Sequence, residues 1–393
     1  MSKRIITGID IGTHSVRVVI TEYIPGEGLP HILGSGKAES RGLRHGYIIN
    51  IADAVRSVRQ AVEEAEQAAG GMHIREAFLS VGGVGLEGTQ TTGAAIISRA
   101  DSQISEADVE RAHRACETNL PNSANKKILH TIPINYTIDG KPIYGRPAGM
   151  RGLKLEATCL IVTSLEQHLN DLIHAIEEAG IEPVDACAAP IAASFVALTK
   201  AQKTAGCILA NIGAETISLV VYEEGIPVSL EVFPMGSTDI TNDIALGLKI
   251  PLEEAEQLKL GKGVNQFPRK KLNDIVLARM QDMFALVIAH LKKIEKHELL
   301  PAGIVITGGG SGIETIEDFA RASTRLPSKI PLIGIDFTNN PKTKRNVKDT
   351  SWFVAYGLAI WGVTNDHPTL AGGDQLFTRF KESMSKLLKQ LLP

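Results

Sequence analysis

The chain has 393 residues, 44% of them hydrophobic and 22% charged, and its 41 Lys and Arg against 44 Asp and Glu give a formal net charge of −3. This length predicts two or three domains with sizeable cores, and the charge balance excludes a general attraction to nucleic acid or to a membrane. The four cysteines include no Cys-x-x-Cys pair, the N-terminus has no export-signal pattern, and no apolar run is long enough to span a bilayer. We therefore expect a cytoplasmic protein rather than a secreted, disordered or integral-membrane one.

The first predicted element is a strand, a glycine turn and a second strand near the N-terminus. A β-branched run from Ile6 reaches Asp10, passes through Gly12, and is followed by a second such run, Val16–Ile20. This pattern is typical of a hairpin with a tight turn. Small residues in such a turn let backbone N–H groups approach an anion closely.

The next segment, residues 74–163, predicts a unit that contains both strands and a helix. It begins with the strand-like run Ala77–Val81 and carries a helix from Ser105, where Ser105 and Asp108 form a partial capping box. A further helix is expected around Leu165–Ala179. After it the chain reads Ala188-Ala189-Pro190.

The N-terminal pattern recurs about 200 residues later, in Cys207–Val221. Gly213 stands where the first copy has Gly12, and Asn211 where it has Asp10. One copy alone would be interpreted as an ordinary hairpin. Two copies in register predict two related lobes that face each other and hold a phosphate tail between them.

A third glycine turn follows the strand-like run Ile304–Thr307, at Gly308-Gly309-Gly310. Alone it could be a generic strand-to-helix turn. In this order along the chain, the three turns favour contact between these glycines and a flat ring or a phosphate.

The C-terminal residues predict an amphipathic helix after a short linker. Residues 364–373 contain proline and paired glycines, and Asp374 is a good N-cap. In residues 374–393, four basic residues exceed two acidic ones, a net charge of +2. The helix either packs on the body or a partner, or lies in the plane of a membrane, which the composition favours. The residues expected to meet the membrane are Leu376, Phe377, Phe380, Lys381, Met384, Leu387, Leu388 and Leu391.

These segments resemble the actin and sugar-kinase superfamily and, within it, the FtsA family of bacterial cell division proteins. The motifs specific to this branch are Arg99–Val109, His130–Pro133 and Gly149–Leu153, and the resemblance extends to Ala255–Lys259 and Trp352–Trp361. It implies an α/β, actin-like two-lobe fold of duplicated ribonuclease-H-like cores, with an inserted α+β subdomain in lobe one and a C-terminal amphipathic helix. The expected divisions are 1–73, 164–204 and 341–363 for the first lobe, 74–163 for the insert, 205–340 for the second lobe, 364–373 for the linker and 374–393 for the membrane-targeting helix.

The resemblance also implies a site for ATP and Mg²⁺, with Asp10 holding the metal through water. The expected nucleotide-binding residues are Asp10, Gly12, Thr13, His14, Ser15, Arg17, Asn211, Gly213, Ala214, Glu215, Thr216, Gly236, Glu256, Lys259, Gly308, Gly309 and Gly310. Two of these assignments have plain alternatives. Arg17 could be a solvated charge on a strand, and Glu256 and Lys259, three residues apart, could be a simple helical ion pair.

The chain departs from the family at the positions that serve hydrolysis. Asn211, Ser218 and Ala189 stand where relatives commonly carry carboxylates, and Glu215 lies within the second phosphate turn. Mg²⁺ prefers carboxylate and phosphate oxygens, so each loss weakens its hold. Glu215 could repel the terminal phosphate or point to solvent. We therefore expect ATP binding with weak or absent hydrolysis.

The partners implied by the resemblance are the C-terminal peptide of FtsZ, further copies of this chain in a filament, other division proteins and an anionic membrane surface, but no nucleic acid. The peptide site is expected near a helix at Asp274–Lys293, where Arg279 suits an acidic peptide, although it could be merely a surface charge. The expected location is the cytoplasmic face of the cell membrane at the division site. The alternatives are an actin-like pilus-assembly protein and, with less support, a small-molecule kinase.

Overall fold

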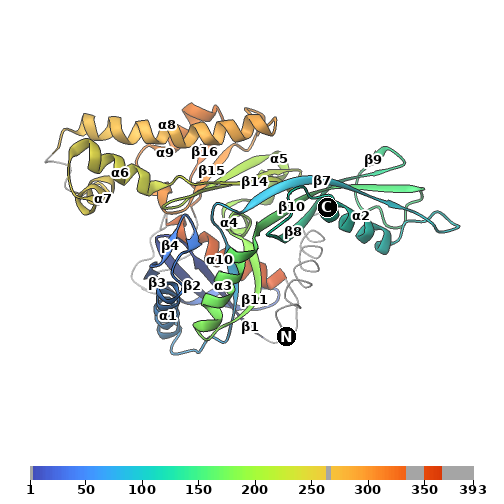
Figure 1. Ribbon diagram of the computed structural model, residues 1–393, viewed down its shortest axis with the longest axis horizontal. Coiled ribbons are helices and arrows are strands. Elements are labelled where there is room, and N and C mark those ends of the chain that lie inside the picture. Colours follow the sequence, from blue (N-terminus) through green and yellow to red (C-terminus); the bar gives the residue numbers. More distant parts are fainter. Residues whose placement is uncertain (1–2, 263–266, 333–348, 365–393) are drawn as a thin grey trace.

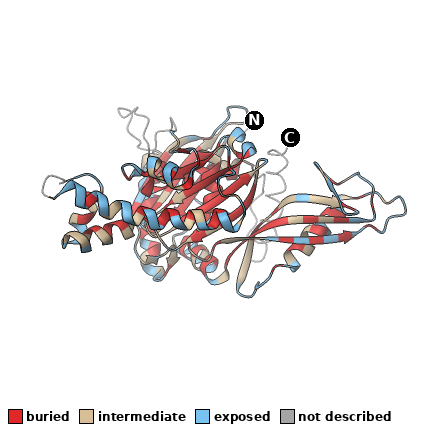
Figure 2. Ribbon diagram, turned by 90° about the horizontal axis from the view of Figure 1, so that it is seen from above, coloured by how far each residue is buried: buried red, intermediate tan, exposed pale blue. Residues whose placement is uncertain are grey.

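The computed structural model describes residues 3–262, 267–332 and 349–364, which form two α/β lobes and an elongated third unit that projects sideways (Figure 1). The C-terminal residues 374–393, for which we expect an amphipathic helix, lie outside the described residues. Buried strands occupy the middle of the body, and exposed residues gather on the outer faces of the helices and on the loops of the projecting unit (Figure 2).

The first lobe is built on a five-stranded sheet in the order β11-β6-β1-β2-β3. Strands β1 (Arg4–Ile11), β2 (Ser15–Tyr23) and β3 (His31–Glu39) form an antiparallel meander, while β6 (Glu76–Val81) and β11 (Glu182–Ala188) add in parallel. Helices α1 (Ile51–Ala68) and α3 (Glu166–Glu178) pack together, α1 on β2 and β3 and α3 on β11. A second pair, α4 (Ala189–Ala197) and α10 (Phe353–Thr364), packs against the same sheet.

The second lobe repeats this sheet. Its order is β14-β13-β12-β15-β16. Strands β12 (Cys207–Ile212), β13 (Ile217–Glu223) and β14 (Ile226–Phe233) form the meander, and β15 (Ile304–Thr307) and β16 (Ser328–Lys329) add in parallel. Strand order and direction match those of the first lobe, so the predicted duplication is confirmed.

Helices of the second lobe lie along one side of the body (Figure 1). They are α6 (Ser237–Leu248), α7 (Leu252–Lys259), α8 (Arg269–Lys293) and α9 (Ile316–Thr324), while the short helix α5 (Lys200–Ala205) packs on β13. Among the described helices α8 is the longest, with 25 residues, and it begins at Arg269, directly after Pro268, instead of at the predicted Asp274. One part of the apolar core of this lobe is a cluster of its own, whereas Leu209, Val220 and Val305 belong to the cluster that fills the first lobe.

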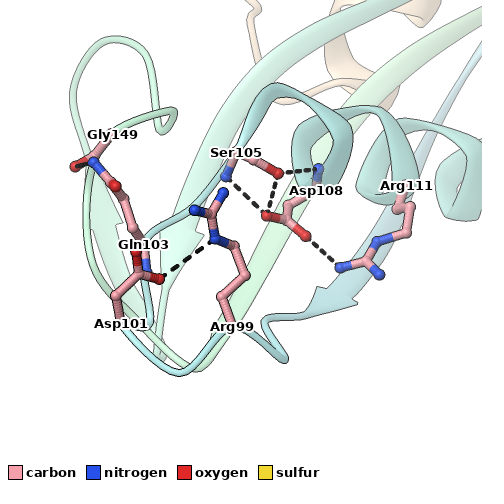
Figure 3. Close-up of polar contacts among 7 residues, drawn as sticks. All are labelled: Arg99, Asp101, Gln103, Ser105, Asp108, Arg111 and Gly149. Carbon is pink, nitrogen blue, oxygen red and sulfur yellow. Dashed lines mark hydrogen bonds and ion pairs between the residues drawn. The ribbon is translucent and has the colours of Figure 1, made fainter.

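The projecting unit is an antiparallel sheet, in the order β7-β10-β8-β9, with one helix packed on it. Its strands are β7 (Glu87–Ile96), β8 (Lys126–Ile138), β9 (Lys141–Ile143) and β10 (Lys154–Leu165), and its helix is α2 (Glu106–Thr118). The predicted helix start is confirmed. The Ser105 backbone N–H donates to Asp108 Oδ2 over 2.8 Å and the Asp108 N–H to Ser105 Oγ over 3.3 Å, which completes the capping box (Figure 3).

One predicted boundary is wrong. We expect the insert to begin at residue 74 with the strand Ala77–Val81, but this strand is β6, which lies between β1 and β11 in the first-lobe sheet. The inserted unit therefore begins after Val81. Strand propensity does not reveal which sheet a strand joins, because the pairing partners are distant in sequence.

Candidate functional site

The two hairpin turns have the same geometry. In the turn between β1 and β2, the Gly12 N–H donates to the Ser15 carbonyl over 3.2 Å, and between β12 and β13 the Gly213 N–H donates to the Thr216 carbonyl over 2.8 Å. Asp10 lies opposite Arg17 in the first ladder and Asn211 opposite Ser218 in the second. The equivalence read from the sequence thus holds residue by residue. We call the turns at residues 12–15, 213–216 and 308–312, with the side chains around them, the inter-lobe site.

Asp10 is a buried carboxylate with one oxygen already engaged. The Ser80 hydroxyl on β6 donates to Asp10 Oδ1 over 2.7 Å. Burial raises the pKa of Asp10, while the hydrogen bond from Ser80 and the charge of Arg17 act in the opposite direction. Ser80 therefore holds Oδ1 in place. Ser80 was missed by the sequence reasoning, since it is 70 residues from Asp10.

Three buried polar atoms without a partner lie beside the glycine turns. Within the described ranges, eight buried side-chain atoms have no hydrogen-bond partner, and Ser15 Oγ, Arg17 Nε and Thr307 Oγ1 are three of them. Buried polar groups are normally paired, so unpaired ones call for an explanation. All three lie on strands that adjoin the glycine turns, and a polyphosphate with its bound water would supply the partners. The residues present therefore fit a nucleotide.

Arg17 is not a freely solvated charge on a strand, so this alternative interpretation of Arg17 is wrong. Its guanidinium carbon lies 5.9 Å from the ring centroid of Trp352, in the 3₁₀ helix η3 (Thr350–Trp352). Half-buried and stacked on an aromatic ring, Arg17 faces Asp10 across the β1–β2 ladder.

The third turn separates its glycines into two kinds. Gly308 has φ 85° and ψ 175°, and a Cβ placed there would lie 2.4 Å from Asn211 Oδ1 and 2.5 Å from the Ile212 carbonyl oxygen. A Cβ on Gly310 would meet Ile212 as well, whereas one on Gly309 would meet nothing within 4 Å. Gly308 and Gly310 thus serve close packing against β12. Gly309 is the glycine with an open face for a ligand.

The Glu256–Lys259 pair is present as an ion pair on α7 and also binds α6. Lys259 Nζ lies 2.7 Å from Glu256 Oε2 and donates to Thr241 Oγ1 over 2.8 Å and to the Ser237 carbonyl over 3.2 Å. Burial raises the pKa of Glu256, but hydrogen bonds from Lys259 and Thr241 lower it more, so that it lies below its ordinary value. The helical ion pair is therefore confirmed, and nucleoside contact stays a prediction that rests on the more exposed Glu256.

His14, in the first turn, is influenced electrostatically by Glu256 and Lys259. The residue is exposed, but burial of part of its ring lowers the pKa of His14. The positive charges of Lys37, Arg17 and Lys259 lower this pKa further, and the negative charge of Glu256 raises it. A group in the first-lobe turn thus feels charges on α7 of the second lobe.

Helix α6 begins directly on the second turn. The Ser237 N–H donates to the Gly213 carbonyl over 2.9 Å and the Thr238 N–H to the Ala214 carbonyl over 2.8 Å. A Cβ on Gly236 would lie 2.3 Å from the Ala214 carbonyl oxygen, so Gly236 allows this docking. The predicted residue Gly236 therefore supports the turn from the helix side.

Glu215 neither points to solvent nor stands free in the turn. Its Oε2 accepts a 2.5 Å hydrogen bond from the backbone N–H of His45, in the hairpin of β4 (Leu43–Arg44) and β5 (Tyr47–Ile48) on the first lobe. The next residue of that hairpin, Gly46, donates its N–H to Thr13 Oγ1 over 3.1 Å. The hairpin therefore contacts both phosphate turns, which the sequence did not indicate.

Arg279 on α8 is held by an acidic side chain of α6. Its Nε and one terminal nitrogen donate to the two carboxylate oxygens of Asp243, over 2.6 and 2.9 Å. Hydrogen bonding to Asp243 raises the pKa of Arg279. An acidic peptide would have to compete with Asp243 for this guanidinium, and the peptide site stays a prediction.

Comparison with known proteins agrees with the architecture. A family model described as "Cell division protein FtsA" matches residues 208–357, and one described as "SHS2 domain inserted in FTSA" matches residues 83–163, the projecting unit. Curated relatives named "Cell division protein FtsA" include that of Neisseria meningitidis, 31% identical over 83% of this chain and 83% of its own length. The Bacillus subtilis protein is 30% identical over 80% of this chain and 75% of its own length. The Pseudomonas aeruginosa protein is 29% identical over 92% and 90%.

Solved structures support the fold alone, because their identities are low. A "PilM-PilN type IV pilus biogenesis complex" chain aligns with a TM-score of 0.69 at 16% identity, over 92% of this chain and 99% of that one. Spiroplasma citri MreB5 bound to ADP aligns with a TM-score of 0.54 at 14% identity, over 92% and 97%. Both alignments support the actin-like fold of this chain, in agreement with its two repeated sheets.

Proposed function

Because this chain belongs to the FtsA family of actin-like cell division proteins, we propose that it binds ATP between its lobes, assembles on the membrane and tethers FtsZ filaments to it. The observation that carries the nucleotide part is the trio of buried, unpaired polar atoms on Ser15, Arg17 and Thr307 beside matched glycine turns. The tethering part rests on the family and on the composition of the C-terminal residues.

In this proposal the turn backbones and Arg17 bind the phosphates, and the open face of Gly309 receives the flat part of the ligand. Mg²⁺, when bound, supplies positive charge between phosphate oxygens, and Asp10 would hold it through water. Ser80 keeps Asp10 in place by its 2.7 Å hydrogen bond.

The same geometry gives few means of activating water. Helix α4 begins at Ala189, Asn211 and Ser218 are neutral, and none of them can act as a general base. We therefore propose a nucleotide-dependent binder with very slow turnover. Titration calorimetry with ATP and Mg²⁺ should show saturable binding, while steady-state phosphate release stays near background. Brisk turnover that Asp10→Ala abolishes would contradict the proposal.

Membrane attachment is assigned to residues 374–393, through a linker of residues 364–373. Ten extended residues reach at most roughly 35 Å, so the body would stay close to the bilayer. Among the described helices, none is long and apolar enough to cross a membrane. One short helix binds a bilayer weakly, and assembly into filaments would add avidity. Deleting residues 374–393 should abolish co-sedimentation with anionic liposomes and leave the thermal unfolding of the body unchanged.

The partner peptide is assigned to the face formed by α6 and α8. Leu246 is 77% exposed and follows Asp243 by three residues on α6, so it lies on the same helix face as the Asp243–Arg279 pair. An acidic, partly apolar peptide would find both kinds of contact there.

Two substitutions distinguish a peptide site from a purely internal ion pair. If the guanidinium of Arg279 binds the peptide, Arg279→Met should weaken binding of a fluorescent FtsZ C-terminal peptide. Asp243→Asn should strengthen it, because the competing carboxylate is gone. If both variants bind the peptide with wild-type affinity, the pair is structural and this assignment is wrong.

A further inference from the structure

The β4–β5 hairpin of the first lobe lies against both phosphate turns. Its two loop residues, His45 and Gly46, both have positive φ, 48° and 84°. This conformation points their consecutive N–H groups at side chains of different lobes, Glu215 Oε2 at 2.5 Å and Thr13 Oγ1 at 3.1 Å. A Cβ on Gly46 would lie 2.4 Å from Gly83 Cα, so the loop is seated on the first-lobe backbone. The hairpin is therefore a fixed part of the first lobe.

This arrangement fixes a carboxylate at the phosphate end of the inter-lobe site. Glu215 belongs to the turn whose Gly213 and Thr216 close the second phosphate loop, and its side chain reaches across to the first lobe. Thr13, in the opposite turn, accepts from the N–H of the very next residue of the same hairpin. Since consecutive backbone N–H groups are only a few ångströms apart, the Glu215 carboxylate and the Thr13 hydroxyl lie close together.

The surroundings do little to cancel this negative charge. His45 Nδ1 lies 3.9 Å from Glu215 Oε2, which is beyond hydrogen-bond distance. Arg17 faces Asp10 and stacks on Trp352. The neutral residues Asn211 and Ser218 offer no carboxylate to strengthen the hold on a neutralising Mg²⁺.

We propose that Glu215 is a specificity-determining residue that makes this site prefer a nucleoside diphosphate to the triphosphate. This proposal rests on the proposed nucleotide site. The γ-phosphate brings additional negative charge to the end of the site that Glu215 occupies. Glu215 can retreat from it only by giving up its hydrogen bond to His45, which also joins the lobes. At the effective dielectric constant of about 20 that is typical near a protein surface, one like charge within about 10 Å weakens binding by about tenfold or more.

The test compares dissociation constants for ADP and ATP, each with Mg²⁺, at pH 8 and 0.1 M salt by titration calorimetry. The wild-type chain should bind ADP at least about tenfold more tightly than ATP. Glu215→Gln keeps an oxygen that can accept from the His45 N–H and removes only the charge. This substitution should reduce the ratio of the ATP dissociation constant to the ADP dissociation constant by about tenfold, mainly because ATP binds more tightly. Glu215→Gly should change the ratio in the same direction.

Glu224→Gln is the matched control, because it removes one exposed carboxylate from the same lobe, in the β13–β14 turn. It should leave the ratio unchanged, and circular dichroism should verify that every variant is folded. An unchanged ratio in Glu215→Gln, or equal weakening of ADP and ATP, would overturn the proposal and leave Glu215 as a lobe–lobe contact only. If the wild-type chain binds neither nucleotide, the proposed function itself is wrong, and this inference with it.

Discussion

Replacing Gly308 with alanine tests the packing of the third turn, with Gly309→Ala as its control one residue away. Gly308 has φ 85° and ψ 175°, a region that is essentially restricted to glycine and costs other residues about 1–3 kcal/mol. The new Cβ would also lie 2.4 Å from Asn211 Oδ1 and 2.5 Å from the Ile212 carbonyl oxygen, and overpacking of this kind costs about 1–3 kcal/mol more. Gly308→Ala should therefore lower the free energy of unfolding by roughly 2–6 kcal/mol.

Gly309→Ala should behave in the opposite way. Its Cβ would meet nothing within 4 Å, and its φ is not positive, so stability should change by less than about 1 kcal/mol. The methyl group would stand on the face assigned to the ligand, and nucleotide affinity should fall by about tenfold. Urea unfolding followed by circular dichroism gives the first quantity, and titration calorimetry gives the second.

The reasoning would be refuted if the two variants unfolded at the same urea concentration, or if Gly309→Ala were the less stable one. Loss of nucleotide binding in a fully stable Gly308→Ala would show that Gly308 is a ligand contact and not a packing residue. The thermal midpoint should agree with the urea result, since both report the same loss of native packing.

Two further substitutions test the buried lysine of α5 and the helix cap of the inserted unit. Lys203 is buried, with Nζ 4.9 Å from the ring centroids of both Phe195 and Tyr222, and burial lowers its pKa from 10.5 to about 8. Between these pH values the unfolded chain binds more protons than the folded one, so the contribution of Lys203 to stability rises with pH, by on the order of 3 kcal/mol in total. Urea midpoints at pH 8 and pH 10 should show this rise in the wild type and its loss in Lys203→Met; identical pH dependence would contradict the assignment. Ser105→Ala removes the N-cap of α2 and should cost about 1 kcal/mol, with Ser102→Ala, outside the capping box, as the neutral comparison.

Local patterns in the sequence predicted the elements whose physics is local. The strand–glycine–strand repeat identified both hairpins, because tight turns and β-branched runs leave a signature within a few residues. The capping box of α2 was predicted for the same reason, since both of its partners lie within one helical turn.

What the sequence did not predict depends on contacts between distant residues. The Glu215–His45 hydrogen bond joins residues that are 170 positions apart, and the local pattern of the sequence gives no information about such a pair. The assignment of β6 to the first-lobe sheet depends on its pairing with β1 and β11. The three glycines of the third turn look alike in the sequence and differ only in φ and in what surrounds them.

The tethering role is tested most directly by co-sedimentation of FtsZ with anionic liposomes in the presence of this chain. The account predicts that FtsZ pellets with the liposomes when the full chain and ATP are present, and stays in the supernatant when residues 374–393 are deleted. FtsZ that remains soluble while the full chain pellets, or that pellets equally with the truncated chain, would contradict it.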